Sequence, residues 1–112
     1  MNRMRGWALA AACAMLAAPG LSAAQGNIEA GRAKAYTCLG CHGVEGYRNA
    51  YPSFRVPRLG GQHSEYLVSA LQAYANGDRQ HPTMQALAET LSEQDMQDIA
   101  AYFEAAGRGG AQ

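Results

Sequence analysis

The sequence predicts an all-α domain, and three observations carry this prediction. Apolar residues recur at helical spacing in several segments, whereas no segment shows the apolar-polar alternation of a half-buried strand. Asn27 and Ser92 stand where helix N-caps are expected, directly before such segments. The segment 40–62 is rich in Gly, Pro, Tyr and Arg and has no regular periodicity, which is unusually long for a loop in a small domain. A loop of this kind is reasonable if it wraps a prosthetic group.

The chain has 112 residues, enough for one domain, and its N-terminus differs from the rest. Arg3 and Arg5 precede an alanine-rich apolar run over residues 7–18, and Pro19 then breaks the run. Small residues lead up to Ala24, after which we expect cleavage. We therefore predict a signal peptide over 1–24, a mature domain over 25–112, and export to the periplasm without stable insertion in the membrane.

Two alternatives for the N-terminus are weaker. An uncleaved anchor is disfavoured because the apolar run is short for a membrane span. A lipid anchor on Cys13 is disfavoured because residues 10–12 are all alanine and lack the expected large apolar residue. Removing 1–24 leaves seven basic and nine acidic residues, a net charge of −2, which gives no support for nucleic-acid binding.

The first two helices are expected on either side of the irregular segment. Asn27 can cap a helix over about 28–36 that runs into Cys38. The next helix covers about 64–76 and should end at Gly77. Its apolar face is formed by Leu67, Ala70, Leu71 and Tyr74.

The C-terminal part of the chain carries the last helix. Ser92 and Asp95 form an approximate capping box, and Gly107 is expected to close the helix. Its buried stripe consists of Met96, Ile99, Ala100 and Phe103. The polar segment 78–83 contains Pro82 and is expected to be a loop, and residues 108–112 are expected to fray.

The motif Cys38-Leu39-Gly40-Cys41-His42 has the C-x-x-C-H spacing of c-type haem attachment. Thiols at i and i+3 near a helix end can reach the two vinyl groups on one edge of the porphyrin and become thioethers. The histidine that follows then lies below the ring with its imidazole directed at the iron. This chemistry takes place outside the cytoplasm, in agreement with the export signal. We therefore predict one haem c, attached through Cys38 and Cys41 and ligated by His42.

Three other interpretations of the motif are weaker. A thioredoxin-like redox pair would need a strand before Cys38, and none is evident. A zinc site could be assembled from Cys38, Cys41, His63 and His81, but their spacing matches no compact zinc finger. A plain disulfide between the two cysteines would close too small a loop to stabilise a domain.

Met84 is the candidate for the second axial ligand. It follows His81-Pro82-Thr83, in a segment expected to lie outside any helical stripe, 42 residues after His42. Met96 lies on the apolar face of the last helix, where core packing is its expected role. His63 or His81 would give a bis-histidine site instead, although both suit polar loop positions. Ligation by a thioether favours Fe(II) and leaves no open site for substrate, which is carrier chemistry rather than catalysis.

The chain resembles the bacterial class I cytochromes c, and most of all one half of the periplasmic diheme high-potential cytochromes and their single-haem relatives. The resemblance is carried by residues 31–43, 57–62, Tyr66-Leu67, Met84, 91–95 and 100–103. It implies a compact cytochrome c fold in which the first and last helices cross near Gly31 and Tyr102. It also implies that the Pro57 carbonyl accepts a hydrogen bond from His42, and that Leu59, Tyr66 and Leu71 pack on the haem. Arg48, Arg55 and Arg58 lie in the wrapping loop and are candidates to pair with the haem propionates.

Two features depart from these relatives. The chain has room for one haem domain rather than two, and the segment 47–54 is more aromatic, with Tyr47, Tyr51 and Phe54. This loop could cover the haem edge or form a docking patch.

We expect a periplasmic single-electron carrier of the respiratory chain rather than an enzyme. A quinol-oxidising complex or a dehydrogenase would be its donor, and an oxidase or reductase its acceptor. The alternative is a tightly bound cytochrome subunit that accepts electrons from one periplasmic dehydrogenase. A third hypothesis is an enzyme or gas sensor in which Met84 leaves the iron.

Overall fold

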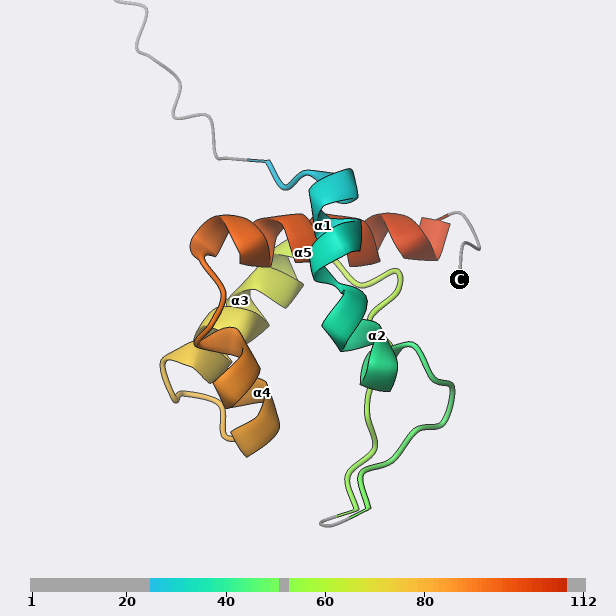
Figure 1. Ribbon diagram of the computed structural model, residues 1–112, viewed down its shortest axis with the longest axis vertical. Coiled ribbons are helices and arrows are strands. Elements are labelled where there is room, and N and C mark those ends of the chain that lie inside the picture. Colours follow the sequence, from blue (N-terminus) through green and yellow to red (C-terminus); the bar gives the residue numbers. More distant parts are fainter. Residues whose placement is uncertain (1–24, 51–52, 109–112) are drawn as a thin grey trace, which may run out of the picture.

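The computed structural model describes residues 25–50 and 53–108, and within them the chain is helical and has no strand. The all-α prediction is therefore confirmed. The predicted signal peptide and Tyr51 lie outside the described residues. No helix of the described part is long and apolar enough to cross a membrane. Figure 1 shows the arrangement of the helices, which are α1 (Ile28–Lys34), α2 (Tyr36–His42), α3 (Ser64–Ala75), α4 (Pro82–Ala88) and α5 (Glu93–Arg108).

Helix α1 begins as the sequence predicts, because the side chain of Asn27 accepts a hydrogen bond of 2.9 Å from the backbone N–H of Ala30. The predicted continuous helix over 28–36 is wrong in one respect. The helix is interrupted at Ala35, and α2 then runs through the whole C-x-x-C-H motif to His42. Ala35 is fully buried in the apolar cluster, and alanine is a strong helix former, so no helix-breaking residue marks this position.

Helices α1 and α5 cross at Gly31, as the resemblance implies. A Cβ atom at Gly31 would overlap the backbone carbonyl of Asp98 and come within 2.9 Å of the Cβ of Tyr102. Glycine is required here because the two backbones approach too closely for any side chain. Figure 1 shows α1 crossing α5 and leading into α2, which lies on the same side of α5 as α3 and α4.

The apolar core is small and lies between α3 and α5. The predicted stripe of α5 is buried in full, including Met96, which packs in the core. Leu67 of α3 joins it, whereas the other predicted apolar residues of α3 are only half-buried. Helix α3 ends as predicted, with Gly77 at a φ of +83° after the C-cap Asn76. The buried apolar residues are Ala35, Leu67, Ala88, Met96, Ile99, Ala100 and Phe103.

The predicted loop over 78–83 is wrong at its end, because Pro82 and Thr83 already belong to helix α4. Pro82 occupies the first turn of α4, where its missing N–H costs nothing and its fixed φ favours the helix. His81 is the N-cap and accepts a hydrogen bond from the backbone N–H of Met84 at Nδ1, over 3.3 Å. Met84 therefore lies in the first turn of a helix, not in a loop.

The C-terminal end of α5 also differs from the prediction. Gly107 does not end the helix, which continues to Arg108. Instead it lies against the turn of the long loop at Gly60 and Gly61, where a Cβ on Gly107 would overlap the backbone of Gly61. The predicted capping box at the other end of α5 is present: Ser92 Oγ accepts from the N–H of Asp95 at 3.1 Å, and Asp95 Oδ2 accepts from the N–H of Ser92 at 2.9 Å.

The long loop runs from Gly43 to His63, somewhat later than the predicted 40–62, and it contains a short paired segment. Arg48 and Arg55 form an isolated antiparallel bridge. Hydrogen bonds flank it on both sides, from Asn49 N–H to the carbonyl of Phe54 at 2.9 Å and from Val56 N–H to the carbonyl of Tyr47 at 3.0 Å. The described part of the loop is therefore paired with itself at this bridge, although none of its described residues belongs to a strand or helix.

Candidate functional site

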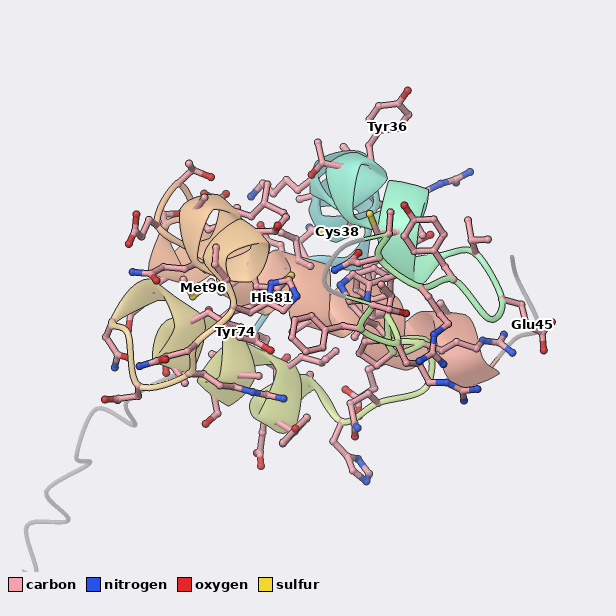
Figure 2. The ribbon with its side chains drawn as sticks, turned by 90° about the horizontal axis from the view of Figure 1, so that it is seen from below. Tyr36, Cys38, Glu45, Tyr74, His81 and Met96 are labelled. Atoms are coloured by element: carbon pink, nitrogen blue, oxygen red, sulfur yellow. The ribbon has the colours of Figure 1, made fainter. Side chains whose placement is uncertain are left out.

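Helix α2 presents the two cysteines of the motif on one side. Residues at i and i+3 share a helix face, so Cys38 and Cys41 are neighbours, and both thiols are free. Cys38 is half-buried against the apolar cluster, and burial raises the pKa of its thiol. Figure 2 shows Cys38 pointing from α2 into the molecule, whereas Tyr36 of the same helix points outward. The pair is thus available as two thiols, one of them directed to the interior.

His42 is the last residue of α2, and one of its two ring nitrogens forms a hydrogen bond with the backbone. Its Nδ1 lies 2.7 Å from the carbonyl oxygen of Pro57. A carbonyl can only accept, so Nδ1 carries a proton, and in the neutral imidazole Nε2 is then the nitrogen with the lone pair. This is the tautomer that a metal ligand at Nε2 needs, and the contact also fixes the direction of the ring. The contact itself is the one that the resemblance implies.

Met84 is half-buried in the first turn of α4, and a contact that the sequence analysis did not foresee supports this turn. His81 caps the helix through Met84 N–H, and the imidazole packs between two rings. Its centroid lies 5.7 Å from that of Phe54 in the loop and 6.4 Å from that of Tyr74 in α3. Figure 2 shows Tyr74 and His81 close together. The dipeptide His81-Pro82 was the available signal, since proline favours the first position of a helix.

The sparse packing of helices α2 and α4 fits a large flat apolar group bound between them. Among the helices of the described part, α2 approaches only α1 and α4 approaches only α3 within 8 Å between Cα atoms. No large side chain of the described residues is fully buried, and Leu39 of α2 and Leu87 of α4 are exposed. A porphyrin bound to the free thiols would supply the apolar contacts that this small core lacks. The donor set of two thiols and an imidazole with a free Nε2 therefore fits haem c.

The zinc alternative does not find its ligands together. No group of three or more His, Cys, Asp or Glu side chains among the described residues could hold a metal ion. The side chain of His63 is exposed, and its Nδ1 lies 3.9 Å from Oε1 of Glu104. The Nδ1 of His81 accepts the hydrogen bond that caps α4. Neither histidine is placed as a partner for Cys38 and Cys41.

The residues expected to surround the haem have different environments. Leu59 packs against the same apolar cluster as Cys38, and Leu71 is half-buried. Tyr66 is 52% exposed, and its hydroxyl accepts a hydrogen bond of 3.4 Å from Arg79. In addition, the Arg79 guanidinium stacks on Tyr74 at 4.9 Å. Arg79 thereby joins Tyr66 and Tyr74, which the sequence analysis did not predict.

The three loop arginines lie at the surface. Arg58 is 4.0 Å from Glu45 and largely exposed, and Arg48 donates a hydrogen bond to Ser53 at 3.3 Å. Arg48 and Arg55 face each other in the bridge, and no ion pair of either is found within 4.0 Å in the described part of the chain.

Comparison with known proteins decides the family. The sequence profile of the family described as Cytochrome c matches residues 28–106, which include both cysteines, His42 and Met84. The chain belongs to the cytochrome c family. Cys38 and Cys41 occupy its C-x-x-C-H position, so this cytochrome binds one haem c covalently through them. The family consists of haem-based electron carriers.

Three relatives show how the chain corresponds to larger and similar-sized cytochromes. It is 44% identical over 84 residues to cytochrome c4 of Pseudomonas aeruginosa, which covers 75% of this chain and 40% of that protein. It is 41% identical over 81 residues to cytochrome c-554(548) of Halomonas halodenitrificans, covering 70% of this chain and 94% of that protein. It is 35% identical over 103 residues to the thiosulfate dehydrogenase electron acceptor of Stutzerimonas stutzeri, covering 88% of this chain and 47% of that protein.

The fold agrees with a solved structure of the same group. The crystal structure of reduced recombinant cytochrome c4 from Pseudomonas stutzeri aligns with a TM-score of 0.59 and 37% sequence identity. The alignment covers 71% of this chain and 45% of that chain. The cytochrome therefore corresponds to about one half of cytochrome c4, a diheme protein, as its sequence indicates.

Proposed function

We propose that this cytochrome is a periplasmic single-electron carrier in which His42 and Met84 are the axial ligands of the haem iron. Haem held by these residues would supply one-electron chemistry through the Fe(III)/Fe(II) couple. The observation that carries the proposal is the hydrogen bond between Nδ1 of His42 and the carbonyl of Pro57. It selects the tautomer of the neutral imidazole in which Nε2 can bind a metal, and it fixes the ring direction, next to two free thiols on the same helix.

Met84 is proposed as the second ligand because of its chemistry and its support. Of the methionines in the described residues, Met96 is 5% exposed in the core, whereas Met84 is half-buried. The His81 cap and the Phe54 and Tyr74 rings hold the turn that carries Met84. A neutral thioether stabilises Fe(II) more than a second imidazole would, and therefore raises the reduction potential.

With both axial positions filled by protein, the residues of this chain hold the iron and exclude other ligands from it. No substrate needs to bind, so we propose a carrier rather than an enzyme. The partners would be redox proteins, with a quinol-oxidising complex or a dehydrogenase as donor and an oxidase or reductase as acceptor. The location rests on the predicted signal peptide over 1–24.

A second candidate is a cytochrome subunit bound tightly to one periplasmic dehydrogenase. It is favoured by the similarity to a protein described as the electron acceptor of thiosulfate dehydrogenase. Co-purification of a second chain from native periplasm would support this candidate. A single peak at the mass of the monomer in gel filtration would support the free carrier.

The axial ligands can be tested by spectroscopy of the holoprotein. A pyridine haemochrome spectrum measures the covalent haem, and the charge-transfer band typical of methionine bound to ferric haem measures the sixth ligand. We expect that band in the wild type and in Met96→Leu, and its loss in Met84→Ala with new binding of carbon monoxide. A band that persists in Met84→Ala would contradict Met84 as the ligand, and native protein that binds carbon monoxide readily would favour a sensor.

A further inference from the structure

The last turn of α5 is in direct contact with the turn of the long loop at Leu59–Gln62. A Cβ atom on Gly107 would overlap both the Cα and the backbone nitrogen of Gly61. From the same side, the N–H of Gly61 donates a hydrogen bond of 2.8 Å to the carbonyl of Phe103. The absence of a side chain at Gly107 is therefore what allows the loop to reach α5.

The Leu59–Gln62 turn is also held by contacts other than the one with Gly107. The N–H of Gln62 donates to the carbonyl of Leu59 at 3.1 Å, which closes a β-turn. Gly61 stands at the third position with a φ of +85°, a conformation that only glycine adopts readily. Leu59, at the start of the turn, packs against the buried cluster formed by α3 and α5. The turn is therefore tied both to the end of α5 and to the apolar cluster.

The same segment of chain carries the partner of the haem ligand. Pro57 lies two residues before Leu59, and its carbonyl accepts the hydrogen bond of 2.7 Å from Nδ1 of His42. Arg58 alone separates Pro57 from the turn, so a shift of the turn displaces the chain next to this carbonyl. A continuous series of contacts thus links Gly107 to Gly61, Leu59, Pro57 and His42.

We infer that Gly107 is a positioning residue for His42: by admitting the Leu59–Gln62 turn to the end of α5, it sets where the Pro57 carbonyl meets the imidazole. This inference rests on the proposed role of His42 as an axial ligand. A strong hydrogen bond at Nδ1 makes the imidazole a more basic ligand, which favours Fe(III). Displacing the turn lengthens that bond and shifts the balance toward Fe(II).

The test compares Gly107→Ala with Gly60→Ala in the haem-loaded protein. Gly60 is the matched control, because a Cβ there meets nothing within 4 Å and its backbone is not in the left-handed region. We expect Gly107→Ala to shift the reduction potential to more positive values, by about a tenfold change in the Fe(III)/Fe(II) equilibrium, the lower end of what losing an outer-shell partner costs. We also expect faster solvent exchange of the Nδ1 proton of His42, measured by NMR.

Gly60→Ala should leave both quantities at the wild-type value. Equal shifts in the two variants, or no shift in Gly107→Ala, would overturn the inference. A truncated chain that ends at Ala106 lacks the end of α5 but places no Cβ against Gly61. It therefore distinguishes the effect of losing the helix end from the effect of the added Cβ. It should keep the wild-type potential, and a shift as large as that of Gly107→Ala would also refute the role of Gly107.

A measurement on the wild type does not depend on whether the variant folds. The Gly61 N–H and the His42 Nδ1–H should exchange through the same opening, with the same dependence on low concentrations of denaturant. Exchange of the Nδ1 proton by an independent opening would overturn the inference. If His42 is not a ligand, the wild-type haem spectrum itself will lack histidine ligation, so failure of the proposed function is distinguishable from failure of this inference.

Discussion

Lys34 of α1 and Asp98 of α5 form an ion pair across the helix crossing, with 2.6 Å between Nζ and Oδ2. Asp98 is 3% exposed, and its Oδ1 also accepts from Asn27 N–H at 2.7 Å and from Gln94 at 2.8 Å. Lys34 reaches Asp95 as well, at 2.7 Å. The carboxylate of Asp98 therefore ties the N-cap residue of α1 to the helix that α1 crosses, and this network makes stability dependent on pH.

We expect acid to unfold the protein through this network. The hydrogen bond from Lys34, followed by those from Asn27 and Gln94, lowers the pKa of Asp98, and Lys34 also lowers the pKa of Asp95. A carboxyl whose folded pKa is depressed contributes stability above its unfolded pKa of about 3.9, and loses it as the pH falls through the folded value. The urea midpoint, followed by circular dichroism, should fall between about pH 5 and pH 2.

Asp98→Asn should flatten that pH dependence and lower stability at pH 7 by roughly 1–3 kcal/mol, because a charged hydrogen-bond acceptor is lost in a buried position. Asp78→Asn is the control, since Asp78 is exposed in the loop before α4. Stability should also fall in alkali, because the hydrogen bonds to Asp95 and Asp98 raise the pKa of Lys34. The contribution of Lys34 is fully present below its unfolded pKa of about 10.4 and is lost as the pH rises through the higher folded value. An acid transition that is identical in Asp98→Asn and in the wild type would contradict this prediction.

Gly31→Ala should destabilise the protein although alanine is the better helix former. The Cβ would overlap the Asp98 carbonyl, and a backbone carbonyl within a helix cannot move away cheaply. Overpacking of this kind costs about 1–3 kcal/mol, which exceeds the gain of about 1 kcal/mol from helix propensity. Chemical denaturation of holoprotein measures the difference, with Gly60→Ala as the control. Unchanged or increased stability of Gly31→Ala would show that the crossing can open without cost.

The sequence predicted those parts of the fold that depend on local signals. Asn27, Gly77 and the Ser92–Asp95 capping box act where the sequence places them, because each satisfies backbone groups a few residues away. The Cys38-to-His42 motif is equally local. The crossing at Gly31 came from the resemblance alone, since a small residue in a helix does not reveal what lies against it.

Three features were missed because they depend on tertiary contacts or on a second role of one residue type. Pro82 was treated as a helix breaker, although proline also favours the first turn of a helix. Gly107 was treated as a helix end, although its partner, Gly61, lies 46 residues away in the sequence. Ala35 has no helix-breaking tendency of its own, so the break before α2 could not be read from local sequence.

His81→Ala should weaken the proposed methionine ligation without touching the ligand. The imidazole caps α4 at Met84 N–H, and loss of an N-cap costs about 0.5–2 kcal/mol. The first turn of α4 then opens more often, and Met84 leaves the iron in a larger fraction of molecules. The charge-transfer band should decrease and carbon monoxide should bind faster. His81→Asn preserves an N-cap acceptor and should stay near the wild type, and equal effects of the two substitutions would exclude capping as the cause.

The arginine pair in the loop should attract anionic reaction partners. Arg48 and Arg55 lie opposite each other in the bridge, an arrangement that repulsion between like charges disfavours. Both arginines are exposed, so an approaching acidic surface can meet their guanidinium groups.

We expect Arg48→Gln/Arg55→Gln to slow oxidation of the reduced holoprotein by hexacyanoferrate(III) about 3- to 10-fold at low ionic strength, at the lower end of electrostatic steering effects. The difference should disappear at high salt, because screening removes attraction between exposed charges. Arg32→Glu is a control with the same change of net charge outside the loop, since Arg32 is exposed in α1. Because the pair is expected to act on approach and not on the haem propionates, the reduction potential of the loop variant should be that of the wild type. An equal loss of rate in both variants would assign the effect to net charge, and a shifted potential in the loop variant alone would assign the arginines to the propionates.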